Sequence, residues 1–164
     1  MNGNKNKILS IALDLFSSKG FDAVGVQTLC EKSGITKPTL YYYFGSKEGV
    51  LKEVLKVNYE KLNSLLEKNT HYTPNPKVYE KDVILTLTGI AQAYLKFAKA
   101  NPKFYKIVLN ATFAPDCGSL NIIAKDLNNI QFQIVEKMFK SMARIHWNMK
   151  GSETRLAWTF IGLI

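Results

Sequence analysis

Three consecutive tyrosines, Tyr41, Tyr42 and Tyr43, form the most unusual cluster of functional side chains in this 164-residue sequence. Phenol rings and hydroxyls can contact the thymine methyl groups, sugars and phosphates of DNA. A surface helix gains little from exposing three large rings to water unless the rings bind something. In the alternative interpretation, one or two of the rings pack against neighbouring helices, and the spacing alone leaves both interpretations open.

The tyrosines follow a segment that has the composition of a tight turn between two helices. Gly34 can adopt positive φ, Ile35 provides an apolar anchor, and Thr36 can cap the next helix. Pro38 then falls in the first helical turn, where its missing N–H costs nothing. The sequence therefore predicts a glycine turn followed by a helix over 37–44.

This helix is predicted to have an inner and an outer face. Leu40 and Phe44 are four residues apart and would both face the core. Two short helices joined by a glycine turn, with polar and aromatic side chains outside the second, form the helix-turn-helix pattern that reads the major groove of DNA. The side chains expected outside are Lys37, Thr39, Tyr41 and Tyr42.

The rest of the chain has helical periodicity and predicts an all-α fold. No period-two alternation and no hairpin turn indicates a strand. The other helices are expected over about 8–19, 26–33, 46–69, 78–100, 102–111, 119–145 and 153–164.

The longest apolar stripe predicts an interface between two copies of the chain. It follows Ser119 with spacings of three and four, and comprises Leu120, Ile123, Leu127, Ile130, Ile134, Met138, Met142 and Ile145. The last helix adds Leu156, Trp158, Phe160 and Ile161, so a two-fold homodimer through a four-helix bundle is expected. Because residues 160–164 are almost all apolar, we expect that the chain continues or that this end is buried in a partner.

The stretch from Ile8 to Leu55 resembles the DNA-binding domain of the TetR family of bacterial regulators. The remainder resembles this family only in architecture, as a run of helices that ends in the two helices of the dimer interface. The resemblance implies a three-helix DNA-binding domain over 1–48 and a helical effector-binding and dimerisation domain over 49–164. The matching segments are residues 12–16, 20–21, 29–30, 34–44 and 46–48.

Three residues depart from the family pattern. Gly25 stands where Ser or Thr usually caps the second helix, so the side-chain cap bond is lost and one candidate phosphate contact is weakened. Cys30 replaces a small buried alanine. Gly49, in the first turn of the fourth helix, is expected to cost about 1 kcal/mol of helix propensity relative to alanine.

The resemblance also implies which side chains contact operator DNA. A phosphate contact of Lys47 is also expected without the resemblance. Lys47 lies at a helix N-terminus beside Ser46, where free N–H groups and the helix dipole favour an anion. The residues matching positions near the major groove are Gln27, Thr28, Lys37, Pro38, Thr39 and Tyr41. The residues matching positions near phosphates are Thr36, Tyr42, Tyr43 and Lys47.

The second half of the chain is rich in aromatic residues, which could form a core, a dimer interface or a ligand pocket. As a group they exceed what a small helical bundle needs, and the resemblance implies an apolar or amphipathic effector among these helices. Release of the protein from its operator by that effector would make it a repressor. The residues predicted to line the pocket are Tyr94, Phe97, Phe104, Tyr105, Val108, Phe113, Phe132 and Met138.

Composition favours a polyanionic partner without locating it. The net charge is +9, from 22 basic and 13 acidic residues. Residues 1–70 have ten lysines against seven acidic residues, and residues 71–164 have twelve basic residues against six acidic ones, so the excess is not concentrated around 37–44. Two cysteines, no apolar run of transmembrane length and no signal-peptide core predict a soluble cytoplasmic protein without a membrane partner.

Two other classes of protein were weighed against a DNA-binding regulator. An enzyme is not expected, because His71 and His146 are isolated in sequence from other candidate catalytic residues and no metal, phosphate-loop or nucleophile motif is present. No cofactor is expected either. Cys117 beside Asp116 is either a redox-sensitive thiol or an ordinary loop cysteine. A helical adaptor without DNA binding is the alternative that the intact helix over 37–44 argues against.

Overall fold

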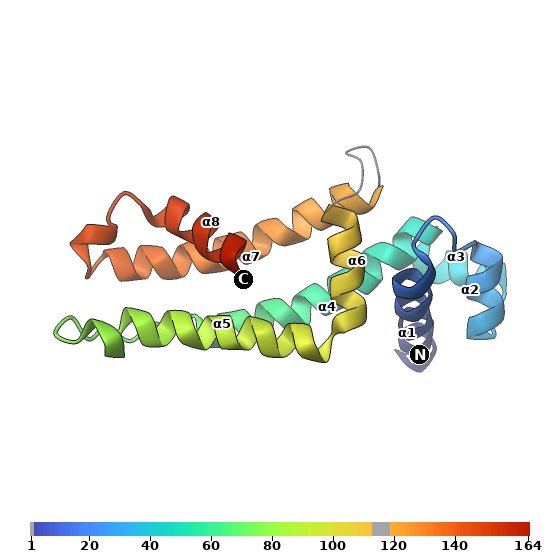
Figure 1. Ribbon diagram of the computed structural model, residues 1–164. Helices are drawn as coiled ribbons and strands as arrows, with labels where there is room; N and C mark the ends of the chain where they lie inside the picture. The colour runs from blue at the N-terminus through green and yellow to red at the C-terminus, as the bar shows by residue number, and fades with distance from the viewer. Residues whose placement is uncertain (1, 113–118) are drawn as a thin grey trace. The chain divides into compact units, whose positions relative to one another are not determined.

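The computed structural model describes residues 2–112 and 119–164, and the regular elements among them are all helical (Figure 1). The predicted all-α class is therefore confirmed. Of the described helices, none is both long and apolar enough to span a lipid bilayer. In chain order the elements are α1 (Asn2–Lys19), α2 (Val26–Ser33), α3 (Lys37–Phe44), α4 (Lys47–Asn69), the 3₁₀ turn η1 (Tyr79–Lys81), α5 (Val83–Ala100), α6 (Pro102–Thr112), α7 (Ser119–Ala143), the 3₁₀ turn η2 (Trp147–Met149) and α8 (Glu153–Leu163).

Most helix boundaries agree with the sequence prediction because local caps set them. α2 and α3 begin and end at the predicted residues. α1 is longer than expected and starts at Asn2, and α7 ends at Ala143, so Ile145 lies beyond it. Phe113 and Cys117 lie outside the described residues.

The helix predicted over 78–100 is divided at Asp82. The Asp82 carboxylate accepts a hydrogen bond from the Asn75 N–H at 3.0 Å, and Nε2 of His146 lies 2.7 Å from the same oxygen. Its backbone has φ −118° and ψ −94°, which are not helical values. A contact from the loop just before it and a contact from a distant segment thus hold Asp82 out of the helix, and α5 begins at Val83.

The chain forms two compact units. The first contains the residues up to Tyr59 together with 101–125, and the second contains 60–100 and 126–164. α6 therefore belongs to the first unit, where it packs on α1. The predicted division of function between 1–48 and 49–164 is a different boundary and stays a prediction.

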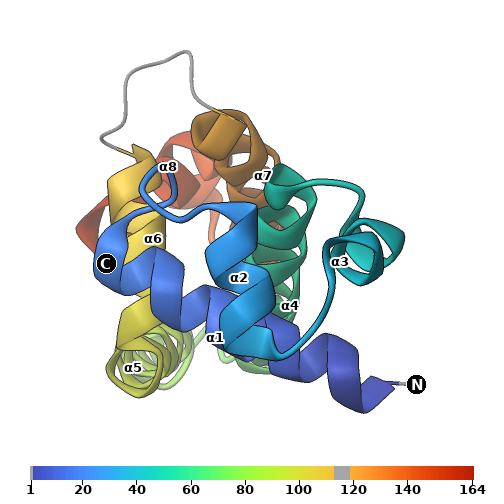
Figure 2. The same ribbon diagram turned by 90° about the vertical axis from the view of Figure 1, so that its right-hand side faces the viewer.

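The core of the first unit is formed by one apolar face from each of its first four helices. Figure 2 shows α2 lying across α1, with α3 following after a short loop. Burial of each large apolar side chain contributes about 1.5–3 kcal/mol, so this core fixes the orientation of α3. Its most deeply buried members are Ile8, Ala12, Phe16, Leu29, Leu40, Val50, Leu51 and Leu55.

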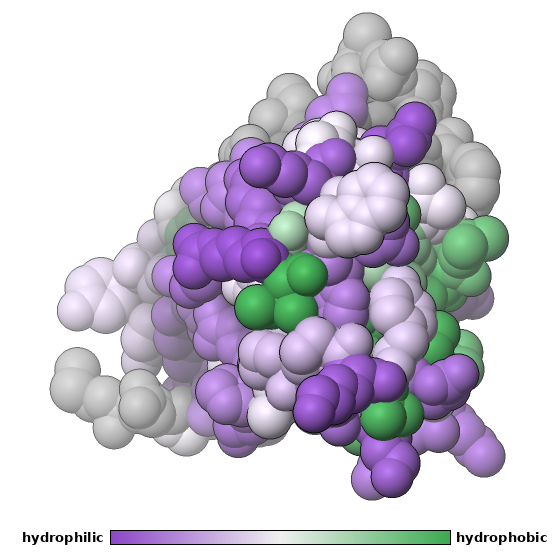
Figure 3. Space-filling model, turned by 90° about the vertical axis from the view of Figure 1, so that its left-hand side faces the viewer, coloured by the Kyte–Doolittle hydropathy of each residue, from purple (hydrophilic) through white to green (hydrophobic). Residues whose placement is uncertain are grey.

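The second unit has its core on α5 and α7, and α8 packs along α7. The Phe132 ring stacks on Trp158 with centroids 4.3 Å apart, and Phe139 meets Phe160 edge-on at 6.1 Å. Figure 3 views the end of this unit that carries η1 and η2, where polar side chains cover most of the face around a small apolar cluster. The main buried core residues are Val83, Ile90, Tyr94, Phe97, Val135, Met138, Phe139 and Met142.

Candidate nucleic-acid interface

The turn between α2 and α3 has the geometry that the sequence predicts. Gly34 is in the left-handed region, with φ 68° and ψ 37°. Its N–H bonds to the carbonyls of Cys30 and Glu31, and the Ile35 N–H donates to the Cys30 carbonyl at 3.0 Å. These bonds satisfy the last carbonyls of α2 and fix the direction in which α3 starts.

The first turn of α3 is capped as expected. The Thr36 hydroxyl oxygen accepts from the Thr39 N–H at 3.4 Å, and the two threonine hydroxyls lie 2.9 Å apart. Pro38 occupies the first turn, where no N–H is required. At the other end, Gly45 at φ 72° donates its N–H to the Tyr41 carbonyl at 2.8 Å.

The outer face of α3 is open to solvent. Tyr42 is 77% exposed and Tyr41 is 47% exposed, and Lys37 and Pro38 are exposed as well. Tyr43 is half-buried, with its ring edge-on to Tyr42 at 5.5 Å between centroids. Two of the three tyrosines thus lie on the surface, while the third is partly packed.

Of the two residues predicted to anchor the inner face of α3, Leu40 and Phe44, only Leu40 is fully buried. Leu40 has no exposed surface. Phe44 is only half-buried, and the Lys5 ammonium lies 5.9 Å from its ring centroid. α3 is therefore anchored chiefly at Leu40 and at its two ends.

The candidate residues on α2 are accessible at its first turn. Gln27 is exposed, and its side-chain amide donates to the Glu31 carboxylate at 2.8 Å. Thr28 is half-buried. Gly25 caps the helix in extended backbone with no side-chain bond, as expected for a glycine at this position.

Lys47 is held in place by contacts within the protein. Its ammonium donates to the Phe21 carbonyl at 3.1 Å and lies 4.2 Å from the centroid of the Phe21 ring. An ammonium has three N–H donors, so two remain for a phosphate. The neighbouring Glu48 stays negative, because hydrogen bonds from its own backbone N–H and from Ser46 lower the pKa of its carboxyl.

The expectation that Gly49 merely costs helix propensity is wrong. The Ser46 hydroxyl oxygen accepts from the Gly49 N–H at 3.1 Å, which caps the start of α4. A Cβ on Gly49 would overlap the carbonyl oxygen of Phe44, at the end of α3. Glycine is therefore required here by the close approach of α3 and α4.

Sequence reasoning missed two lysines on α1, because it started this helix at Ile8. The Lys5 ammonium forms a 2.6 Å ion pair with Glu53 on α4. The Lys7 ammonium lies 4.0 Å from where a side chain on Gly34 would begin, beside the turn that precedes α3. The signal available in the sequence was the position of these two lysines, shortly before the apolar pattern of α1.

The residues predicted to line an effector pocket are divided between the two units. Phe104, Tyr105 and Val108 belong to the first unit, where the Phe104 ring meets Tyr59 edge-on at 5.1 Å. Phe113 lies outside the described residues. The members that belong to the second unit are Tyr94, Phe97, Phe132 and Met138.

A cavity of about 510 Å³ lies within the second unit, and its lining is mixed in polarity. Met138 is the member of the predicted set that contributes to it. The lining residues are Glu67, Thr70, His71, Tyr72, Ile134, Lys137, Met138 and Ser141.

A buried polar cluster lies in the same unit. Nε2 of His146 is 3.0 Å from the Tyr72 hydroxyl and 2.7 Å from the Asp82 carboxylate, which is 1% exposed. Burial raises the pKa of the Asp82 carboxyl, but hydrogen bonds from Tyr72, the Asn75 N–H and His146 outweigh this effect and lower it. His146 is isolated in the sequence as expected, but the fold gives it polar partners from 64 and 74 positions away.

Comparison with known sequences assigns the N-terminal helices to a described family. Residues 8–54 match the family model of bacterial regulatory proteins, tetR family. A 65-residue segment is 34% identical to the biofilm operon icaADBC HTH-type negative transcriptional regulator IcaR of Staphylococcus aureus. That match covers 40% of this chain and 35% of IcaR, about a third of the relative's length.

Comparison with solved structures supports the same fold over nearly the whole chain. The fatty acid degradation regulator FadR from Bacillus halodurans has a TM-score of 0.77 at 15% identity, covering 96% of this chain and 81% of FadR. The transcriptional regulator FadR from Bacillus subtilis, in complex with stearoyl-CoA, has a TM-score of 0.75 at 14% identity, with 96% and 81% coverage. At these identities the likeness shows the arrangement of helices.

Proposed function

From the match of residues 8–54 to the tetR family of bacterial regulatory proteins, we propose that the chain is a dimeric repressor of this family that binds operator DNA. The observation that carries the proposal is the outer face of α3. Its exposed Tyr41 and Tyr42, beside Lys37 and Pro38, lie on a helix that Leu40 and the caps at Thr36 and Gly45 hold rigidly. A rigid helix with an exposed polar and aromatic face suits the major groove.

We assign the contacts with DNA to two classes. Side chains on α2 and α3, namely those of Gln27, Thr39 and Tyr41, meet base edges. Tyr42 and Lys47 meet phosphates, and Lys7, beside the turn, is added to this class. Phosphate contacts position the protein on the duplex, whereas base contacts set its sequence preference.

The dimer is proposed to form through α7 and α8. Ile130 on α7 is 44% exposed and Trp158 on α8 is 61% exposed, and the Phe132 ring stacks on Trp158. Large apolar side chains that remain exposed on neighbouring helices are typical of an interface. A two-fold dimer would present two copies of α3 to successive major grooves, roughly 34–36 Å apart.

Release from DNA is proposed to follow the binding of an apolar or amphipathic effector by the second unit. The Bacillus subtilis FadR structure is described with stearoyl-CoA, and IcaR is described as a negative regulator. These descriptions belong to those proteins and motivate the proposal for this chain. The effector must bind the DNA-incompetent arrangement more tightly, because equal affinity for both states would shift neither.

The test is DNA binding by the purified chain. We expect footprints on the DNA upstream of its own gene, with an affinity that falls steeply as salt rises, because bound phosphates release counterions. Tyr42→Ala should weaken the footprint without changing the fold, since Tyr42 is 77% exposed. No protection at low salt would instead favour the adaptor that lacks DNA binding.

A further inference from the structure

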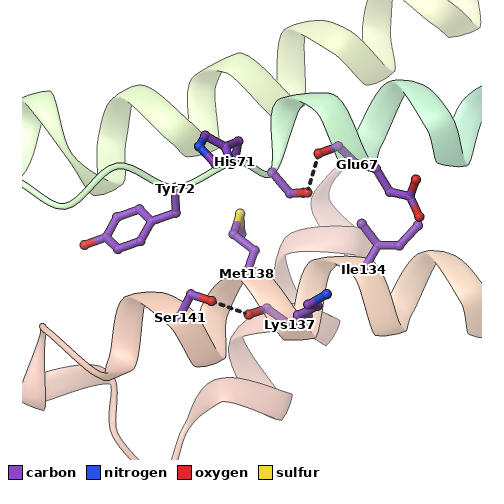
Figure 4. A pocket seen from close by; sticks show the side chains of 8 residues that line it. Glu67, His71, Tyr72, Ile134, Lys137, Met138 and Ser141 are labelled. Atoms are coloured by element: carbon purple, nitrogen blue, oxygen red, sulfur yellow. Dashed lines mark hydrogen bonds between the residues drawn. The ribbon is translucent and has the colours of Figure 1, made fainter.

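The cavity in the second unit lies between the end of α4, the segment that follows it, and α7 (Figure 4). Its volume of about 510 Å³ is in the range of small-molecule sites. Its lining is half polar in character and differs from the aromatic set predicted from the sequence. The cavity is therefore distinct from the predicted effector pocket, with which it shares Met138.

Two opposite charges reach the cavity from opposite sides. Figure 4 shows Glu67 on α4 and Lys137 on α7 at the end of the cavity that Ile134 also lines. Among the described residues, neither Glu67 nor Lys137 has an ion-pair partner. A carboxylate and an ammonium that are both unpaired favour a ligand that carries both charges.

The two aliphatic hydroxyls in the lining, those of Thr70 and Ser141, both donate to backbone carbonyls and are left as acceptors toward a ligand. Thr70 donates its O–H to the Glu67 carbonyl at 3.1 Å, and Ser141 donates to the Lys137 carbonyl at 3.1 Å. A hydroxyl has one O–H and two lone pairs, so lone pairs remain on both oxygens. Ser141 lies toward the end of the cavity away from Glu67 (Figure 4), where it could accept a bond from a ligand N–H.

The middle of the cavity is apolar and its far end is aromatic. Met138 is 2% exposed, and Ile134 one turn earlier on α7 is half-buried. The Tyr72 ring lies at the end opposite Glu67 (Figure 4), and its hydroxyl is 3.0 Å from Nε2 of His146, which fixes the ring. Met138 and the Tyr72 ring thus offer apolar surface to a flat ligand group.

We propose that this cavity binds a zwitterion of the amino-acid type with a large aromatic side chain. The ligand's ammonium pairs with Glu67 and its carboxylate pairs with Lys137. The ligand's ring lies over Met138 toward Tyr72, and a ring N–H donates to Ser141. The site shares Met138 with the predicted effector pocket, but none of its residues is assigned to DNA, so the proposal does not rest on operator binding.

The experiment measures binding to the full chain of three probes that share one ring system. Tryptophan carries both charges, tryptamine carries only the ammonium, and 3-indolepropionic acid carries only the carboxylate. Binding at neutral pH is followed by titration in ¹⁵N–¹H correlation spectra, which detect millimolar affinities. Tryptophan should bind at least about fivefold more tightly than either analogue, as expected for one charge-assisted contact at each end.

Two variants identify the charge partners. Glu67→Gln should bring tryptophan to the affinity of 3-indolepropionic acid, and Lys137→Gln should bring it to that of tryptamine. Both side chains are exposed, so neither change should unfold the protein. The matched controls Glu80→Gln and Lys140→Gln lie outside the cavity lining and should leave the tryptophan affinity unchanged.

Three outcomes would overturn the proposal. Absence of binding by all three probes at millimolar concentration would show that the cavity is not a site of this class. Equal affinity of the three probes would reduce the site to an apolar contact. Tightest binding by one of the single-charge analogues would make it a cation or anion site. None of these outcomes bears on operator binding.

Discussion

At the scale of single residues, Gly49 shows how a close approach of two helices reverses a propensity argument. Gly49→Ala should destabilise the protein by about 1–3 kcal/mol, because a Cβ would overlap the Phe44 carbonyl and force α3 away from α4. Urea unfolding measures the change. The matched control is Gly89→Ala in α5, where no atom lies within 4 Å of the new Cβ, and this change should stabilise by about 0.5–1 kcal/mol. A stabilising Gly49→Ala would contradict the close approach.

The buried Asp82 carboxyl makes stability depend on pH in the acid range. The pKa of this carboxyl is lower in the folded protein than in the unfolded chain. Its stabilising contribution is therefore complete above the ordinary aspartate pKa of about 4, and it is lost as pH falls through the lower pKa of the folded state. Asp82→Asn should lower the free energy of unfolding by roughly 2 kcal/mol at neutral pH, since hydrogen bonds to a buried charge are weakened.

Unfolding titrations between neutral pH and about pH 3 separate this effect from a general loss of stability. The wild-type protein should lose more stability than Asp82→Asn over that interval, so the two curves should converge in acid. Asp14→Asn is the control, because Asp14 is in an exposed ion pair with Lys103 and should change little. Parallel curves for the wild type and Asp82→Asn would mean that another group dominates the acid response.

At the scale of the elements, the DNA contacts proposed for α3 and for the start of α4 divide into base contacts and phosphate contacts. Thr39→Ala and Tyr41→Ala should relax base preference by about 1–3 kcal/mol at particular positions, whereas Tyr42→Ala and Lys47→Ala should weaken binding to all sequences. Gel-shift titrations on the operator and on single-base variants distinguish the two patterns. Tyr42→Phe, which removes only the hydroxyl, should lose most of what Tyr42→Ala loses. Wild-type binding by all four alanine variants would exclude α3 as the reading helix.

The elements also show what local sequence can and cannot predict. The bounds of α2 and α3 follow from Gly34, Thr36 and Gly45, which act on their own neighbours in the chain. The start of α5 does not, because Asp82 is held by His146 from a distant segment. The predicted effector pocket is divided between the two units for the same reason. Aromatic composition does not specify to which compact unit a ring such as Phe104 belongs.

At the scale of the whole molecule, the proposed dimer can be tested at residues that the structure leaves exposed. Ile134, a member of the apolar stripe, lines the cavity, so Ile130 and Trp158 are better probes of the interface. Ile130→Glu and Trp158→Glu should each shift the protein from dimer to monomer in sedimentation velocity, because a charge would be buried without a partner. Leu85→Glu on α5, at a position 65% exposed, should leave the dimer intact. A monomeric wild-type protein at micromolar concentration would count against operator binding by a dimer.

Coupling between effector and operator is proposed to pass through α4. This helix runs unbroken from Lys47 to Asn69, with Val50 and Leu51 buried in the first unit and Leu62 and Leu66 buried in the second. An effector that displaces the far half of α4 would move the near half, and with it the position of α3 in each half-site. The effector should lower operator affinity roughly fivefold or more, the usual range of coupling between two sites.

The continuity of α4 can be weakened at its exposed face without touching either site. Lys61→Gly with Ser64→Gly should cost about 1 kcal/mol of helix propensity at each position, while Lys61→Ala with Ser64→Ala should keep the helix rigid. Operator affinity is measured with and without a ligand found by thermal-shift screening of apolar and amphipathic compounds. The glycine pair should retain ligand binding but lose most of the ligand's effect on operator affinity, because a flexible joint does not transmit displacement. The alanine pair should behave as the wild type does, and an effect of equal size in both pairs would show that coupling bypasses α4.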